Sequence, residues 1–224
     1  MRRDRQSELM DDPAVEPGAH RRALAALRRV NRWLGVERRL VRAIGRTVAA
    51  PSATILDVGT GGGGLVQCAR RHGLSWRVCA LDRAPLALHE VRSGAAPDAP
   101  ACVAGDALRL PFADRSVDVV ACSLLLHHFD PADAEQLLRE AARVCRQAVV
   151  IGDLDRTRLA WVLTWLVTRL TSRSHIFHVD GPRSVRAAYR PDEARSLAER
   201  AGLSACHVRS DFPFRWILHW RRAA

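Results

Sequence analysis

The sequence contains no lysine, so all 35 of its basic residues are arginines, and the chain carries a net charge of +11 at pH 7. A charge of this size ordinarily indicates a nucleic acid or an anionic membrane as the partner. The exclusive use of arginine instead indicates coding bias, and the arginines are spread along the chain. We therefore expect no nucleic-acid substrate. The segment before the first strand is nevertheless basic, through Arg21, Arg22, Arg28, Arg29, Arg32, Arg38, Arg39 and Arg42.

Tyrosine and paired cysteines are also scarce. With one tyrosine and no lysine, the chain cannot form the Tyr-x-x-x-Lys pair of a nicotinamide-dependent reductase. The six cysteines form no C-x-x-C pair and fall mostly in apolar runs, which is typical of buried, reduced thiols. They are Cys68, Cys79, Cys102, Cys122, Cys145 and Cys206.

Long hydrophobic segments are absent as well. The apolar run from 159 to 167 is too short to cross a bilayer. No apolar stretch of the kind found in signal peptides follows Met1, so we expect a cytoplasmic protein. The length of 224 residues fits one medium-sized α/β domain with a sizeable core.

What the chain does have is a run of four glycines directly after a short apolar segment. Ile55, Leu56 and Val58 suit a strand that is buried on both faces. The glycines allow the backbone to turn sharply while it lies close to a ligand, and the amides of the next helix would point at that ligand.

Two ligand patterns fit this loop. Gly59, Gly61 and Gly64 match the dinucleotide pattern G-x-G-x-x-G. The pattern D/E-x-G-x-G-x-G of S-adenosylmethionine sites fits equally well, through Asp57, Gly59, Gly61 and Gly63. The glycines alone do not separate the two ligands.

Two further acidic residues follow later strands. Asp82 comes after a strand at 76–81, where a carboxylate can accept hydrogen bonds from both hydroxyls of a ribose. Asp106 follows the third strand, in the segment GDALRLPFADRSVDVV that spans 105–120.

With this last segment the chain resembles the class I S-adenosylmethionine-dependent methyltransferases of the small-molecule type, such as those that tailor quinones and polyketides. The resemblance covers about 54–152 and implies S-adenosylmethionine as cofactor. It also implies an α/β fold with a Rossmann-like, doubly wound, seven-stranded and mostly parallel sheet, whose last strand is antiparallel. The cofactor-binding residues that it implies are Asp57, Gly59, Thr60, Gly61, Gly63, Asp82, Arg83, Asp106, Ala107, Ser123 and Leu124.

The order of elements agrees with this resemblance. We expect a flexible leader at 1–18, an N-terminal helical cap at 19–50, and a methyltransferase domain at 51–224 with a lid at 154–190. Alternating strands and helices predict a parallel sheet covered on both faces. The strands are expected at 53–58, 76–81, 101–105, 117–122, 147–152, 204–210 and 214–220, and the helices at 63–72, 84–93, 131–144 and 191–201.

The lid bears most directly on the substrate. Its aliphatic residues Leu159, Val162, Leu163, Leu166, Val167 and Leu170 recur at helical spacing, which predicts one apolar face buried on the domain. Trp161 and Trp165 would then point away from that face. They would line a substrate pocket, touch a second subunit, or dip into a membrane surface.

Four histidines are candidates for a general base, namely His127, His128, His175 and His178. A base is needed only if the methyl acceptor is a protonated oxygen or an acidic carbon. Arg183 and Tyr189 are candidates for binding a carboxylate or a phenol of the substrate. We see no set of acidic ligands for a metal beyond the cofactor aspartates, so we expect no metal.

The sequence therefore predicts methyl transfer to an apolar or aromatic small molecule, with O-methylation preferred and C-methylation next, in a monomer or a homodimer. Three alternatives stay open. A nucleic-acid or protein methyltransferase is disfavoured because 123–129 reads SLLLHHF and not N/D-P-P-Y/F. A nicotinamide-dependent reductase lacks its catalytic pair. A non-catalytic partner protein would not need the intact glycine loop.

Overall fold

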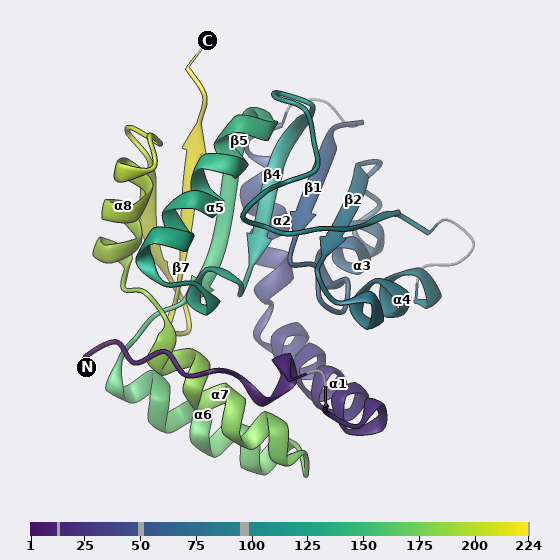
Figure 1. The fold of residues 1–224 in the computed structure, drawn as a ribbon, viewed down its shortest axis with the longest axis vertical. Coiled ribbons are helices and arrows are strands. Elements are labelled where there is room, and N and C mark those ends of the chain that lie inside the picture. The colour runs from purple at the N-terminus through teal and green to yellow at the C-terminus, as the bar shows by residue number, and fades with distance from the viewer. Residues whose placement is uncertain (13, 49–51, 95–98, 224) are drawn as a thin grey trace.

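The computed structural model describes residues 1–12, 14–48, 52–94 and 99–223. A seven-stranded sheet forms its centre, in the order β3-β2-β1-β4-β5-β7-β6 (Figure 1). The first five strands are parallel, and β7 runs antiparallel to both of its neighbours. The bounds of the strands are β1 Thr54–Val58, β2 Arg77–Asp82, β3 Ala101–Ala104, β4 Val117–Ser123, β5 Cys145–Leu154, β6 His207–Asp211 and β7 Arg215–Arg221.

The predicted fold class is thus confirmed, and each predicted strand is present within three residues of its expected bounds. β1 and β4 are buried almost throughout because helices cover both of their faces. These two strands form the middle of the sheet together with β5, which is buried from Ala148 to Ile151.

The helices form three groups. α5 (Pro131–Val144) and α8 (Pro191–Arg200) pack together on one face of the sheet, and α2 (Val36–Gly45) and α3 (Gly64–Arg71) cover the other. α4 (Pro85–Ser93) packs on β2 and β3 near the sheet edge. The third group, α1 (Pro17–Leu34), α6 (Arg158–Thr171) and α7 (His175–Ala187), lies below the ends to which β1 and β4 point.

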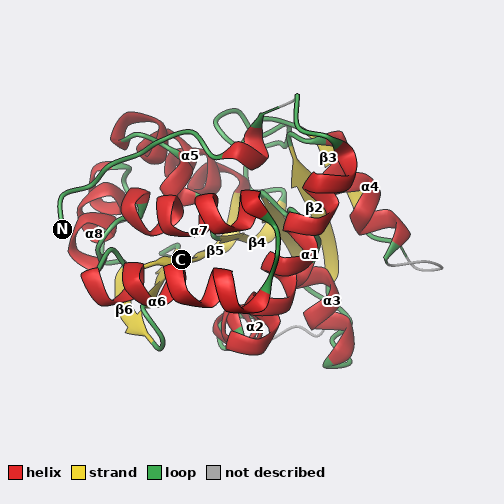
Figure 2. Ribbon diagram, turned by 90° about the horizontal axis from the view of Figure 1, so that it is seen from below, coloured by secondary structure: helices red, strands yellow, loops and turns green. Residues whose placement is uncertain are grey.

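This third group includes the expected lid and the first helix of the expected cap, α1, whereas α2, the second helix of that cap, packs on the sheet. Seen from below, α6 and α7 run side by side across the end of the sheet, with α1 next to them (Figure 2). Gly35 separates α1 from α2, because its left-handed conformation (φ 67°) ends the first helix. Pro13 and the boundary that we placed between residues 50 and 51 lie outside the described residues.

The first twelve residues depart from the expectation of a flexible leader. They run along α7 and end in a short turn of 3₁₀-helix, Leu9–Asp11. We call residues 1–12 the N-terminal arm. The arm is fixed by long-range bonds, including Asp4 N–H to the carbonyl of Arg186 and Arg3 Nε to the carbonyl of Ala187. Polar composition suggested disorder, but these polar groups find partners in the last third of the chain.

The lid helix α6 also departs from its expected orientation. The aliphatic face that we expected to be buried points outward, with Leu159 57% and Leu170 76% exposed. The helix instead buries Ala160 and Thr168. Helical spacing placed five of the six aliphatic residues on one face correctly, and Val167 instead packs with Ala26, Val30 and Phe177. Spacing carries no information about which face meets the domain.

None of the helices in the described part of the chain is long and apolar enough to cross a membrane.

Candidate active site

The glycine loop joins β1 to α3 at the carboxyl end of the sheet. Gly59, Gly61 and Gly63 all have positive φ, at 67°, 51° and 71°, which glycine adopts without steric cost. A Cβ on Gly59 would lie 2.7 Å from the side chain of Leu125, in the loop after β4. Gly59 is therefore required both by its backbone angle and by the close approach of the neighbouring loop.

Two aspartates hold this loop in place. The hydroxyl of Thr60 donates to Asp57 Oδ2 at 2.7 Å, and the amide of Gly61 donates to Asp82 Oδ2 at 2.8 Å. Asp82 also accepts from the amide of Ala84 at 2.9 Å. Both carboxylates thus shape the loop from within, while Asp82 remains partly exposed.

Asp57 is fully enclosed, and burial raises its pKa to about 7, with the hydrogen bond from Thr60 acting in the opposite direction. A buried carboxyl group of this kind is costly in its charged form. In the structure its contact is with Thr60 and not with open space, so it supports the loop from below.

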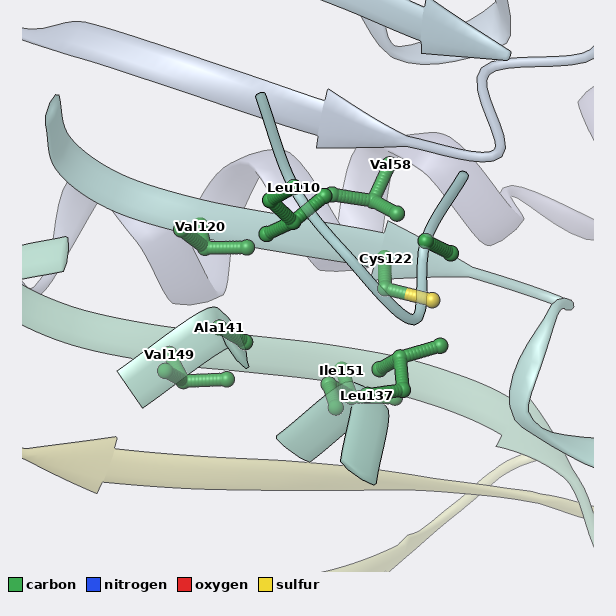
Figure 3. Close-up of a pocket in the computed structure, with 9 residues that line it drawn as sticks. Val58, Leu110, Val120, Cys122, Leu137, Ala141, Val149 and Ile151 are labelled. Carbon is green, nitrogen blue, oxygen red and sulfur yellow. The ribbon is translucent and has the colours of Figure 1, made fainter. Parts of the chain in front are cut away.

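Asp106 and Ala107 are the residues that the sequence predicted to face the adenine of the cofactor. Asp106 Oδ1 accepts from the amide of Leu108 at 2.9 Å, which closes a tight local turn. Ala107 packs toward the core, where it lines the pocket drawn in Figure 3 together with Leu110 and Val58. All nine lining side chains are apolar and leave no space for a water molecule, so this pocket is a packed core beneath the loop and not a ligand site.

The opposite wall of the site follows β4. Ser123 ends the strand, and Leu124 has a positive φ of 54°. The amide of Leu124 donates to the carbonyl of Gly152 on β5 at 2.8 Å. Non-glycine residues at positive φ are uncommon and are concentrated at functional sites.

Helix α1 of the cap contacts this loop. Arg28 of α1 donates to the carbonyl of Gly62 at 3.5 Å and pairs with Glu90 of α4 at 3.4 Å. A Cβ on Gly62 would lie 2.5 Å from the Cδ of Arg28. α1 therefore covers the glycine loop, whereas α2 packs into the core on the sheet.

His127 is the best-placed candidate for a base. It is buried just beyond β4, and its Nδ1 lies 2.7 Å from Asp153 Oδ1 at the end of β5. The other oxygen of Asp153 accepts from the backbone amide of His127 at 3.1 Å. This double contact fixes the position and the orientation of the imidazole ring. The second ring nitrogen, Nε2, does not contact Asp153.

Glu8 of the N-terminal arm faces that nitrogen. Its Oε1 lies 3.7 Å from His127 Nε2, its Oε2 lies 3.8 Å from His128 Nε2, and it accepts a short hydrogen bond from the hydroxyl of Ser184. Burial by itself would lower the pKa of His127, but the charges of Asp153 and Glu8 outweigh it and raise the pKa to about 10. Burial would likewise raise the pKa of Glu8, but His127 and His128 hold it at about 2. With the arm in this position His127 is therefore a cation.

The arm is anchored on both sides of this contact. Arg3 donates to the carbonyls of His127 and Phe129, and Arg5 forms two hydrogen bonds with the carboxylate of Asp130. Further along, the buried carboxylate of Asp180 accepts from the amides of Leu9 and Met10 at 2.8 and 2.9 Å. Sequence reasoning missed Glu8 as a member of the site, because one glutamate in a polar leader carries no periodic or motif signal.

The other candidates are dispersed. His175 is exposed at the start of α7, and His178 Nε2 lies 2.7 Å from the carbonyl of Ser172. Arg183 donates to the carbonyl of Ser7 in the arm. Tyr189 is buried and donates to the carbonyl of Phe129 at 2.8 Å. Arg83 is exposed beside Asp82.

The two tryptophans of α6 have different surroundings. Trp161 lines an open groove of about 650 Å³, together with the first four residues of the arm and Arg186. Within the described chain its buried indole Nε1 has no hydrogen-bond partner. Trp165 lies on the outer surface, where the guanidinium of Arg169 stacks 4.2 Å from its ring.

Glu8, His127 and His128 have ligand atoms within 4.8 Å of one another, close enough to hold a metal ion. Both ring nitrogens of His127 face carboxylates, however. A protonated imidazole therefore balances the negative charge of these carboxylates without a metal ion. The absence of a metal site therefore stays a prediction.

A Rossmann-like sheet with a glycine loop after β1 is typical of nucleotide-binding α/β domains. Acidic residues lie within β1 (Asp57), at the end of β2 (Asp82) and after β3 (Asp106), as in methyltransferase domains. Comparison with protein families agrees, because residues 56–151 match the model of the methyltransferase domain. This match to a methyltransferase domain agrees with the resemblance to class I S-adenosylmethionine-dependent methyltransferases that the sequence indicated.

The similar proteins are methyltransferases whose names give different substrates or partners. The chain is 36% identical over 131 residues to the malonyl-[acyl-carrier protein] O-methyltransferase of Dechloromonas aromatica (strain RCB), a match that covers 58% of this chain and 44% of that protein. The chain thus spans less than half the length of this curated relative.

Solved structures share the fold at low identity. The complex between the Trm112 methyltransferase activator and a methyltransferase of Haloferax volcanii matches with a TM-score of 0.66 and 18% identity, over 94% of this chain and 100% of that one. Human N-acetylserotonin methyltransferase in complex with S-adenosylmethionine matches with a TM-score of 0.64 and 16% identity, over 92% and 57%.

Proposed function

We propose that this protein transfers a methyl group from S-adenosylmethionine to an oxygen of an apolar or aromatic small molecule, with a carbon acceptor as the next choice. The observation that carries the proposal is the pairing of His127 with Asp153 at the carboxyl ends of β4 and β5. A buried imidazole with its Nδ1 fixed by a carboxylate is suited to take a proton from a hydroxyl group.

The loop residues fit the cofactor. A Cβ on Gly61 would meet nothing within 4 Å, so the backbone of the loop is open to a ligand there, whereas the Cβ positions of Gly59 and Gly62 are filled by Leu125 and Arg28. Asp82 has a partly exposed carboxylate for a ribose, and the exposed Asp106 would face the adenine. When bound, the cofactor supplies an electrophilic methyl group on a sulfonium.

The arm determines the protonation state of His127. While Glu8 faces Nε2, His127 keeps its second proton and is no base. An acceptor hydroxyl that takes the place of Glu8 removes one of the two negative charges that hold this proton. The pKa of His127 then falls toward its usual range, so His127 releases its second proton to water. The neutral Nε2 is then free to accept the proton that the hydroxyl loses on methylation.

The acceptor would enter along the groove lined by the arm and Trp161. The indole ring of Trp161 offers an apolar surface to the acceptor. Trp161, Arg183 and Tyr189 were the proposed substrate residues, together with Trp165. Of these, Trp161 keeps this role in our proposal.

The first test is calorimetric titration of the protein with S-adenosylhomocysteine, with NADH and NADPH in parallel. Micromolar binding of S-adenosylhomocysteine alone supports the proposal and justifies a screen of phenolic and quinone acceptors. Binding of a nicotinamide instead would overturn it, and binding of none of the three would favour a non-catalytic partner protein.

The role of His127 is tested on an acceptor found in that screen. His127→Asn should lower kcat strongly and leave the affinity for S-adenosylhomocysteine unchanged, whereas His175→Asn, on the surface of α7, should change neither. A full kcat in the His127 variant would contradict the proposed base. Methylation of RNA or of a protein, without any small-molecule acceptor, would favour the alternative substrate class.

A further inference from the structure

The outer face of α6 is an exposed apolar surface. Five aliphatic side chains on it are between 38% and 76% exposed, which is unusual for a group of large residues on one helix. They are Leu159, Val162, Leu163, Leu166 and Leu170. We call them the apolar face of α6.

The opposite face of α6 is already packed against the domain. A Cβ on Gly181 of α7 would lie 2.7 Å from Thr168 Cγ2 and 3.2 Å from Thr164 Cγ2, so the two helices approach closely through small residues. Val167 packs with the cluster of Ala26, Val30 and Phe177. The helix is thus fixed in its rotation, and the apolar face cannot turn inward without breaking these contacts.

Positive charge borders this face. Arg158, Arg169 and Arg173 are exposed at the two ends of the helix. The sequence has no acidic residue between Asp155 and Asp180. The apolar face is therefore bordered by cations that no acidic side chain of the same segment neutralises.

Aromatic residues lie at the border of the face. Trp165 is 42% exposed and carries the guanidinium of Arg169 on its ring. On α1, Arg29 donates to the carbonyl of Thr171 at the end of α6. Trp33, one turn after Arg29, is 75% exposed. Tryptophan is enriched where apolar and polar environments meet.

We propose that the apolar face of α6 binds to the surface of an anionic lipid bilayer. The fourteen-residue helix is about 21 Å long, shorter than the hydrocarbon core, so it would lie in the plane of the interface. The leucines and Val162 enter the boundary between headgroups and acyl chains. Arg158, Arg169 and Arg173 meet the phosphates.

A second copy of the chain fits this face less well. In a two-fold symmetric dimer each patch contacts itself, so the same arginines would come together without any acidic residue between them. Anionic headgroups complement the charge of the border, whereas an identical copy repeats it. The proposal concerns this outer surface and stands independently of the reaction and of its acceptor.

The proposal is tested by sedimentation of the full chain with vesicles. One set contains phosphatidylcholine alone, and the other contains equal parts of phosphatidylcholine and phosphatidylglycerol. We expect binding to the anionic vesicles that weakens as salt is added, and at least tenfold weaker binding to the neutral ones. Equal binding to both sets, or binding to neither, would overturn the proposal.

Three variants locate the surface. The triple variant Arg158→Gln, Arg169→Gln, Arg173→Gln should weaken anionic-vesicle binding by about tenfold to a hundredfold. Leu166→Gln with Leu170→Gln should also weaken it, because apolar contact is lost. A matched control, Arg92→Gln, Arg195→Gln, Arg209→Gln, removes three exposed arginines from α4, α8 and β6 and should bind as the wild type does.

Circular dichroism and light scattering complete the test. All variants should keep the helical signal of the wild type, since the replaced side chains are exposed. If the control loses as much binding as the α6 variants, net charge and not this face is responsible. A dimer that dissociates in the leucine variant, combined with no vesicle binding, would assign the face to a second copy instead.

Discussion

At the scale of single residues, the carboxylates near the glycine loop and the arm have different tasks. Asp57 is buried below the loop, Asp82 holds the loop and remains accessible, and Asp153 orients a histidine. The sequence indicated the positions of the first two by their spacing from the glycines. It did not indicate that Asp153 would pair with His127, because that contact depends on the register of β4 with β5.

Asp82→Ala should weaken the binding of S-adenosylhomocysteine by about 1–3 kcal/mol, because hydrogen bonds to the ribose are lost. The variant also loses the bond from the Gly61 amide, so part of the effect would come from a looser loop. Calorimetry measures the change in affinity. Asp82→Asn keeps one acceptor oxygen, so its affinity should lie between those of the wild type and Asp82→Ala. Unchanged affinity in Asp82→Ala would rule out the ribose assignment.

Asp57→Asn should change how stability depends on pH. The pKa of Asp57 is raised to about 7 in the folded protein, so this carboxyl group favours folding when it is protonated. Its contribution is lost as the pH rises from its ordinary pKa of about 3.8 through about 7. The asparagine cannot ionise, so the variant should gain stability relative to the wild type over this range.

Urea unfolding of both proteins at several pH values measures that difference. We expect the variant to fold without the cofactor, because the asparagine side chain can still accept the hydrogen bond from the hydroxyl of Thr60. A difference in unfolding free energy that stays constant between pH 4 and pH 8 would contradict the raised pKa of Asp57.

Glu8→Gln should give a difference in stability from the wild type that is largest at intermediate pH and smaller at both low and high pH. The pKa of Glu8 is lowered to about 2, so its contribution is present above about 4.5 and is lost as the pH falls through 2. The pKa of His127 is raised to about 10, so its contribution is complete below about 6.5 and is lost as the pH rises through 10. The unfolding free energy of the wild type should therefore exceed that of the variant most between about pH 4.5 and 6.5.

Titration of the His127 ring by NMR provides an independent readout. In Glu8→Gln the pKa of His127 should be lower than in the wild type, since one of its two carboxylate neighbours loses its charge. Glu16→Gln is a suitable control, because Glu16 caps α1 and has no contact with His127. An identical pKa in wild type and Glu8→Gln would mean that the arm does not control His127.

At the scale of elements, local sequence signals were sufficient for the core and insufficient for the lid. The bounds of α5 were predicted from Pro131, which suits the first helical position, and from the regular apolar spacing after it. Asp130 does occupy the N-cap position, but it gives its carboxylate to Arg5 and not to the helix. The rotation of α6 was predicted wrongly, because apolar spacing does not distinguish a core from an outer binding surface.

The contact between α6 and α7 gives a test at this scale. Gly181→Ala would place a methyl group 2.7 Å from Thr168 Cγ2, so the helices must separate. We expect a loss of about 1–3 kcal/mol in unfolding free energy. Gly202 is no suitable control because its φ is positive, whereas Gly152, with ordinary contact at 3.6 Å, should tolerate alanine better.

At the scale of the whole molecule, the site combines segments that lie far apart in the sequence, namely the arm, the glycine loop and α7. The glycine loop belongs to the segment that matches the methyltransferase domain, and the sequence predicted its position, while the binding of the cofactor by its residues stays a prediction. The arm and α7 lie outside that segment. Their contacts join residues with more than 120 intervening positions, and no short motif encodes such pairs.

Removal of residues 1–12 should lower the unfolding free energy by at least about 2 kcal/mol, since the buried carboxylate of Asp180 loses the amides of Leu9 and Met10. Binding of S-adenosylhomocysteine should change much less, because the arm does not touch the glycine loop. Thermal unfolding and calorimetry measure the two effects, and equal stability with and without the arm would contradict its anchoring role.

The arm also affects how the protein is made. Arg3 finds its partner 184 residues further on, at Ala187, and the carbonyl of Met1 accepts from Arg156 on the segment after β5. The residues of the arm must therefore remain without these native contacts until the segment that contains Ala187 has been translated. Cotranslational folding can assemble β1 to β5 in order, but the wall around His127 closes only after α7 has been made.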